Sequence, residues 1–281
     1  MVSVRPPARS PIRQPGFLFS GRRVSAMVLR YFYLLRGSLP RIVELCYWPT
    51  MQMMIWGFLS QFLYQQSEWF LRAGGILIAA VLLWDIMFRS NIGVAISFLE
   101  EMWSRNLGQL FASPLRPYEW AISLLAISGL RTLIGVLPAA LLAIPLYHYS
   151  IFDMGLPLVA FFTNLLIFGS AVGLAVSGLV LRFGLGAESL AWAAIFAVAP
   201  LSGIYYPVSV LPDWLQPVAF ALPSAHVFEG MRAAVIDGVF LTERFLWSVG
   251  LNVIYLALGM AAFLFAFHVA RRRGQLLQMG E

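Results

Sequence analysis

Long apolar runs alternate with short polar segments along the whole chain. Six of these runs approach the roughly 20 residues that a helix needs to cross a bilayer. They cover residues 42–63, 71–95, 119–146, 156–181, 188–209 and 246–270. The pattern predicts an all-α integral membrane protein with six transmembrane helices.

A polar segment, Phe98–Trp120, separates the second run from the third. Its apolar residues Met102, Trp103, Leu107, Leu110 and Phe111 fall at roughly helical spacing, among acidic, basic and amide side chains. This spacing predicts a short amphipathic helix at a membrane surface, ended by Pro114 and Pro117. An ordinary interfacial loop is the alternative.

A second unusual segment, Gly203–Gly238, follows the fifth run. It is apolar but is broken by four prolines, at positions 207, 212, 217 and 223. The pieces between these prolines are too short to cross a bilayer, so we expect short helices that enter the membrane and return. Backbone of this kind is tolerated where protein or a watery cavity covers it, and the segment is therefore expected to line or plug an exit.

The N-terminal region differs from the rest in its prolines and arginines. Residues 1–19 predict a disordered cytoplasmic tail. Residues 20–37 combine an apolar stripe with Arg22, Arg23, Arg30 and Arg36, which predicts an amphipathic helix on the anionic cytoplasmic face. Residues 38–270 then form the six-span domain, and residues 271–281 a cytoplasmic tail.

Composition supports the membrane assignment. The 281 residues are 60% hydrophobic and 11% charged, and mean hydropathy is +0.80, whereas soluble domains carry about 25% charged residues. The net charge of +6 does not indicate nucleic-acid binding, because the basic residues lie beside apolar runs. The single cysteine, Cys46, cannot form an internal disulfide.

The arginines also predict orientation. All 19 basic residues are arginine, and placing the N-terminus inside leaves only Arg72, Arg232 and Arg244 outside, with Arg131 within a span. Cytoplasmic segments are enriched in basic residues, so both termini and the Phe98–Trp120 segment are expected in the cytoplasm.

Catalytic and nucleotide-binding motifs are absent from the sequence. A Walker A loop requires a lysine that reaches the phosphates, and this chain contains none. His148, His226 and His268 lie far apart and predict no metal site. An enzyme is therefore disfavoured, and any ATP-driven motor is expected on another chain.

Charged residues within the runs predict a polar network of Glu44, Asp85, Arg89 and Arg131. Asp85 and Arg89 stand four apart and can pair along one helix face, while Arg131 could instead meet Asp85 from the third run. An internal ion pair that locks helices and a functional relay are both open. Gly169 and Gly173 form a GxxxG pair, for which packing within the subunit is favoured over dimerisation.

The chain resembles the permease subunit of type-2 ATP-binding-cassette exporters in two sequences, EEMWSRNLGQLFASPLRPYEW and GIYYPVSVLPDWLQPVAFALPSAHVFEGMR. The pattern of the second sequence is closer to drug and lipooligosaccharide exporters than to O-antigen permeases. The first resembles the coupling helix, which in that family docks in a cleft of the ATPase subunit. The resemblance assigns coupling to these residues: Glu100, Glu101, Trp103, Arg105, Asn106, Leu107, Leu110, Ser113 and Pro114. The second resembles the outer re-entrant helices, and the corresponding gate residues are Gly203, Tyr206, Pro207, Leu211, Pro212, Leu215, Pro223, His226, Glu229 and Arg232.

The resemblance implies an ATP-driven exporter of a lipophilic or amphipathic substrate that works by alternating access in the cell inner (cytoplasmic) membrane. Its partners would be two cytoplasmic ATPase subunits and a second permease, expected as a homodimer, with no nucleic acid. No cofactor is expected on this chain, since Mg-ATP would bind the partner ATPase. A lipid-linked oligosaccharide or polysaccharide exporter is the alternative, followed by a lipid-modifying membrane enzyme or a passive channel.

Overall fold

The computed structural model describes residues 19–64 and 70–273. Within these ranges the chain forms helices and turns and no strand. Four helical stretches are long and apolar enough to cross a membrane: Gly75–Trp103, Pro117–Tyr147, Leu156–Phe183 and Thr242–Arg272. The predicted all-α class is confirmed. The predicted tails fall mainly outside the described residues.

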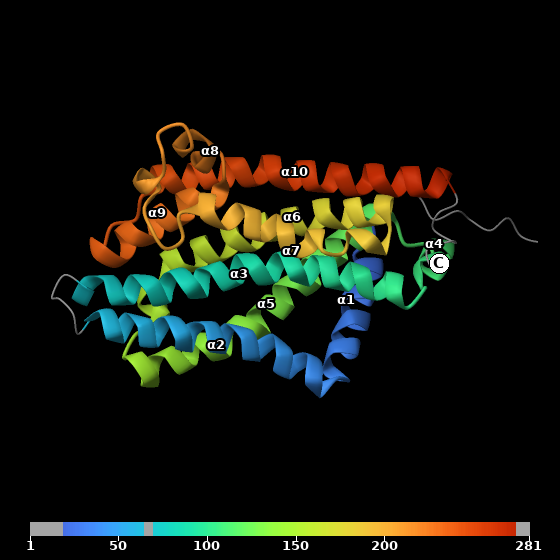
Figure 1. The fold of residues 1–281 in the computed structure, drawn as a ribbon. Coiled ribbons are helices and arrows are strands. Elements are labelled where there is room, and N and C mark those ends of the chain that lie inside the picture. The colour runs from blue at the N-terminus through green and yellow to red at the C-terminus, as the bar shows by residue number, and fades with distance from the viewer. Residues whose placement is uncertain (1–18, 65–69, 274–281) are drawn as a thin grey trace, which may run out of the picture.

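Five long helices form a bundle and lie lengthwise in Figure 1. They are α2 (Leu39–Tyr64), α3 (Phe70–Trp103), α5 (Pro117–Tyr147), α6 (Leu156–Phe183) and α10 (Thr242–Arg272). Helix α6 packs against both α3 and α10, and α3 also packs against α2 and α5. These helices match five of the six predicted spans, except that α3 continues past residue 95 to Trp103. Helix α2 has 26 residues but is not one of the four stretches that are apolar enough over their length, and polar residues such as Glu44 and Gln52 interrupt its sequence.

Small residues bring α6 close to α3. A Cβ atom added at Gly169 would lie 2.2 Å from the carbonyl oxygen of Met87, and one at Gly173 would lie 2.7 Å from that of Asn91. Only glycine permits this approach of two helix backbones. The GxxxG pair therefore packs within the subunit, as the sequence favoured.

A short helix, α1 (Gly21–Arg36), lies across the bundle at the end where α3 finishes and α5 begins (Figure 1). It buries Met27, Tyr31 and Leu35, which are spaced by four residues and so share one face. This helix coincides with the amphipathic segment predicted at residues 20–37.

The predicted fifth span, residues 188–209, is wrong as a single helix. Helix α7 (Leu190–Val198) continues only as the 3₁₀ turn η3 (Ala199–Ser202). Gly203 then adopts a left-handed conformation with φ of 62° and ends the helix. The helical part rises only about 20 Å, which is less than the bilayer core of about 30 Å.

The proline-containing segment after Gly203 folds as short helices. These are η4 (Val208–Val210), α8 (Gln216–Phe220) and α9 (Pro223–Ile236). Pro217 and Pro223 lie in the first turns of α8 and α9, where a missing N–H costs nothing. Helices α8 and α9 lie at the end of the bundle opposite α4 (Leu107–Ala112) (Figure 1).

Candidate coupling surface

The candidate coupling segment is a tight turn followed by a helix of a single turn and a half. Helix α3 ends at Trp103, Arg105 adopts a left-handed φ of 55°, and α4 covers Leu107–Ala112. Because Pro117 starts α5 only a few residues later, α4 is fixed between the ends of two long helices.

The structure divides the predicted coupling residues into a buried and an exposed group. Leu107 and Leu110 are buried in the same apolar cluster as Phe98 and Trp120. The exposed group consists of Trp103, Arg105, Ser113 and Pro114. This second group is the surface that α4 and its flanking turns present away from the bundle, and we call it the α4 surface.

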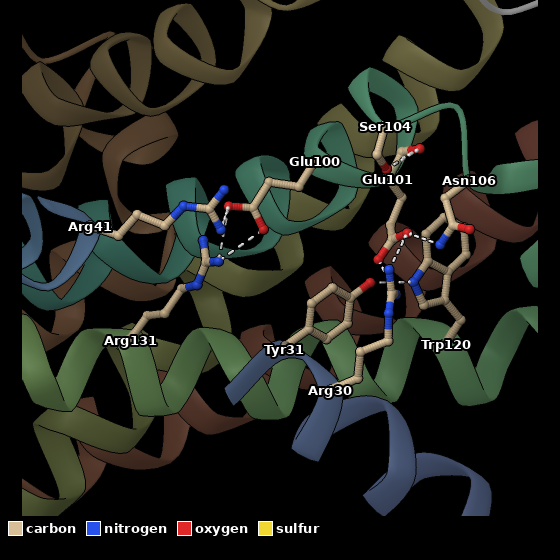
Figure 2. A network of polar contacts seen from close by, with 9 residues as sticks. All are labelled: Arg30, Tyr31, Arg41, Glu100, Glu101, Ser104, Asn106, Trp120 and Arg131. Carbon is tan, nitrogen blue, oxygen red and sulfur yellow. Dashed lines mark hydrogen bonds and ion pairs between the residues drawn. The ribbon is translucent and has the colours of Figure 1, made fainter. Parts of the chain in front are cut away.

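Glu101 does not belong to the α4 surface, since it is only 1% exposed. Arg30 of α1 donates two hydrogen bonds to its carboxylate, one of them from Nη2 to Oε2 over 3.1 Å. The side-chain amide of Asn106 donates to the same oxygen over 2.7 Å. Figure 2 shows Glu101 between Arg30 and Asn106. The carboxylate thus joins the end of α3 to α1 and to the turn before α4.

Glu100 points in a different direction and is shared by two arginines (Figure 2). Arg131 of α5 donates to its two oxygens over 3.0 and 3.2 Å. Arg41 of α2 lies 3.3 Å from it. The end of α3 is therefore tied to α2 and α5 through Glu100 and to α1 through Glu101.

Glu119, in the first turn of α5, is a third carboxylate at this end of the bundle and is fully buried. Arg23 of α1 donates to its two oxygens over 2.8 and 2.6 Å. The backbone N–H groups of Ser20 and Arg116 donate over 2.9 and 3.1 Å. Glu119 therefore fastens the start of α1 to the start of α5.

A hydrogen bond between aromatic side chains completes the attachment of α1. The indole N–H of Trp120 donates to the hydroxyl oxygen of Tyr31 over 2.9 Å (Figure 2). Burial raises the pKa of Tyr31, and the nearby Glu101 carboxylate raises it further, so the hydroxyl remains neutral.

These contacts were not predicted from the sequence. The sequence pattern placed Arg23 and Arg30 at a lipid surface and gave Glu119 no role. One signal was present: Arg23 and Arg30 stand seven residues apart, which places them two turns apart on one face of α1. Their carboxylate partners lie 96 and 71 residues away, and only the fold reveals them.

Neither ion pair predicted for Asp85 is present among the described residues. Arg131 pairs with Glu100 instead, while Arg89 interacts with Asp85 electrostatically without a direct ion pair. Helical side chains point toward the N-terminus of their own helix, and α5 begins at the α4 end. Arg131 therefore reaches toward Glu100, while Asp85 lies farther along α3 in the opposite direction. Glu44 lies on the exposed face of α2.

Two side chains of α9 hold the start of the proline-containing segment. Nη1 of Arg232 donates to the carbonyl oxygen of Gly203 over 2.8 Å, and Nη2 donates to that of Tyr206 over 2.6 Å. Glu229 accepts the backbone N–H of Val208 over 2.7 Å and contacts Arg232 over 3.2 Å. The predicted gate residues Gly203, Tyr206, Glu229 and Arg232 thus form one contact group, the α9 clasp.

The other predicted gate residues lie around the clasp. The His226 ring is bonded to the carbonyl oxygen of Phe220 at 2.8 Å. Pro223 is buried, Leu211 and Leu215 are half-buried, and Pro207 and Pro212 are exposed.

Comparison with known proteins places this arrangement in a family. The profile of the ABC-2 type transporter family matches residues 32–236, from the last turns of α1 to the end of α9. A similar protein is ABC transporter G family member 20 of Dictyostelium discoideum, which is 29% identical over 172 residues. That match covers 60% of this chain but only 23% of the relative, so the chain corresponds to less than a quarter of the relative's length.

The fold and these matches define a multi-pass membrane protein of the transport class. The chain belongs to the ABC-2 type transporter family and is its transmembrane, or permease, component. Permeases of this family work together with ATPase subunits.

Proposed function

We propose that this permease exports a lipophilic or amphipathic substrate and is driven by a separate ATPase that docks on the α4 surface. The observation that carries the proposal is the construction of that surface. Exposed Trp103 and Arg105 stand directly after Glu100 and Glu101, whose ion pairs reach α1, α2 and α5. A force applied at α4 would therefore act on four helices together.

The separate motor is supported by the sequence. No lysine occurs in the 281 residues, so a Walker A loop has no residue to reach the nucleotide phosphates. Mg-ATP would bind the partner. Two such permeases, expected as identical copies, and two ATPases would complete the transporter.

The orientation that we propose places the α4 end in the cytoplasm, within a cell inner membrane. The C-terminal end of α10, with Arg271 and Arg272, lies at the same end as α1 and α4 (Figure 1). Basic residues of short loops remain on the cytoplasmic side. Both termini would then be cytoplasmic, and the α9 clasp would face outward as part of a gate.

The substrate class is supported by the resemblance of the outer segment to drug and lipooligosaccharide exporters. A lipid-linked oligosaccharide or polysaccharide remains the second candidate. Transport assays with either cargo in vesicles that contain the complete transporter would separate the two.

Purification of the permease with its ATPase tests the coupling role. We expect the Arg105→Glu variant to recover at least tenfold less ATPase than the wild type, because charge reversal at an exposed docking surface weakens association. Arg105→Asn should have a smaller effect, since asparagine tolerates a left-handed backbone.

Arg244→Glu provides the control, because it makes the same charge reversal at the opposite end of the bundle. It should leave ATPase recovery within twofold of the wild type. Equal recovery with the Arg105→Glu and wild-type chains would refute docking at the α4 surface.

A further inference from the structure

Asp85 is a buried carboxylate that the coupling contacts do not use. It lies in the apolar part of α3 and is 1% exposed. Its Oδ2 atom accepts no hydrogen bond from the described residues, and none of the ion pairs among them includes it. A carboxylate without a partner is costly inside a membrane, and such residues usually mark a binding site or a transport pathway.

Two arginines, Arg131 and Arg89, were predicted to pair with Asp85. Arg131 pairs with Glu100 at 3.0 Å. The Arg89 side chain runs past α5, since a Cβ atom at Gly135 would lie 3.2 Å from its Cδ and 3.4 Å from its Nε. Arg89 interacts electrostatically with Asp85 and, to a smaller extent, with Glu44 of α2. Neither arginine closes a direct ion pair with the Asp85 carboxylate.

A pair of aromatic rings lies on α2, which packs against α3, and on the segment after η3. Asp85 acts electrostatically on Tyr205, which follows η3. The Tyr205 ring stacks on Trp56 of α2, with centroids 4.4 Å apart and planes at 12°. A carboxylate beside aromatic faces is the combination that recognises an ammonium or another organic cation.

The α9 clasp holds the segment that carries Tyr205. Tyr205 stands between Gly203 and Tyr206, whose carbonyl oxygens accept from Arg232. Release of the clasp would free the backbone of this segment, and movement of Tyr205 would also separate its ring from Trp56. The carboxylate would then be uncovered from the α9 end.

We propose that Asp85 binds the cationic group of an amphipathic substrate, and that Trp56 and Tyr205 contact its apolar part. The proposal rests on the exporter function above and names its substrate class. The charged and titratable groups that act on this region are Arg89 of α3, Glu44 and Cys46 of α2, and Tyr205.

Two probes of the same size and opposite charge test the proposal. Saturable binding of tetraphenylphosphonium and tetraphenylborate is measured on the complete transporter in lipid nanodiscs. The wild type should bind the cation and not the anion. Asp85→Asn should weaken cation binding at least tenfold, Asp85→Glu should retain most of it, and Asp153→Asn, an exposed carboxylate on η1 (Ile151–Met154), should leave it within twofold.

Tyr205→Ala is the second variant and applies even where Asp85→Asn does not give a monodisperse protein. It should weaken cation binding at least threefold. Wild-type affinity in Asp85→Asn or in Tyr205→Ala, or the absence of saturable cation binding in the wild type, would overturn the proposal. These outcomes leave ATPase recovery unaffected, so failure of this site is distinguishable from failure of the exporter function.

Discussion

At the scale of single residues, the three carboxylates around α4 point into the protein and do not belong to the α4 surface. Glu101 and Glu119 are 1% and 0% exposed, and each is paired with an arginine of α1. Burying such a pair stabilises a fold only weakly, because the desolvation of both charges offsets most of their attraction. Removing one partner is more costly, since the other then stays without its counterion. These pairs therefore determine where α1 sits more than how stable the bundle is.

Glu101→Gln tests this role. The variant leaves Arg30 beside a neutral amide, and the loss of a charged hydrogen bond of this kind costs about 1–3 kcal/mol. We expect a lower midpoint of thermal unfolding in detergent and faster proteolysis within α1. Glu243→Gln, in an exposed position at the start of α10, serves as the control. Equal midpoints for both variants would contradict the structural role of the pair.

At the scale of elements, close approach of helix backbones positions the charged groups. Helix α6 can lie against α3 only because Gly169 and Gly173 carry no side chain. Helix α3 in turn carries Asp85 near its middle and Glu100 and Glu101 near its end. A change in this contact would therefore move both the coupling residues and the buried carboxylate.

Gly169→Ala measures the contact. The added methyl group would overlap the carbonyl oxygen of Met87 at 2.2 Å, and overpacking of this kind costs about 1–3 kcal/mol. The midpoint of thermal unfolding should fall. Gly250→Ala is the matched control, because a Cβ atom there meets nothing within 4 Å and alanine favours a helix. Its midpoint should stay or rise, and a similar fall in both variants would point to a general intolerance of alanine.

The α9 clasp holds the chain together at the end of the bundle opposite α4. Arg232→Leu leaves the carbonyl oxygens of Gly203 and Tyr206 without their donor. Amide hydrogen exchange across residues 203–208 should become at least tenfold faster. Asp237→Asn, at the exposed end of α9, should leave the exchange unchanged. Unaltered protection in Arg232→Leu would show that the clasp does not hold the segment.

At the scale of the whole molecule, the pattern of apolar runs was enough to predict the class and most of the helices. Helices α3, α5, α6 and α10 follow directly from run length, since only a helix satisfies the backbone within lipid. The prediction of a fifth span was wrong because hydropathy does not reveal a left-handed backbone conformation such as that of Gly203. The polar contacts could not be predicted for another reason. Glu100 and Asp85 are equally plausible partners of Arg131 in the sequence, and the direction of α5 decides between them.

Orientation is also a property of the whole molecule, and the single cysteine makes it measurable. In a Cys46→Ser background, Trp214→Cys and Ala112→Cys place one thiol at each end of the bundle, both in exposed positions. Trp214→Cys should react with a membrane-impermeant maleimide in intact cells. Ala112→Cys should react only after permeabilisation. The reverse pattern would place the α4 end outside.

The ion pairs of α1 have a consequence for biogenesis. Arg23 and Arg30 are synthesised 96 and 71 residues before the carboxylates that they finally meet. Throughout that interval they carry uncompensated positive charge next to the first hydrophobic helix, where such charge directs insertion by the translocation machinery. Only after α3 and the start of α5 have been made can Glu101 and Glu119 neutralise them. The same two arginines therefore act first as signals that orient the nascent chain and later as permanent attachments of α1.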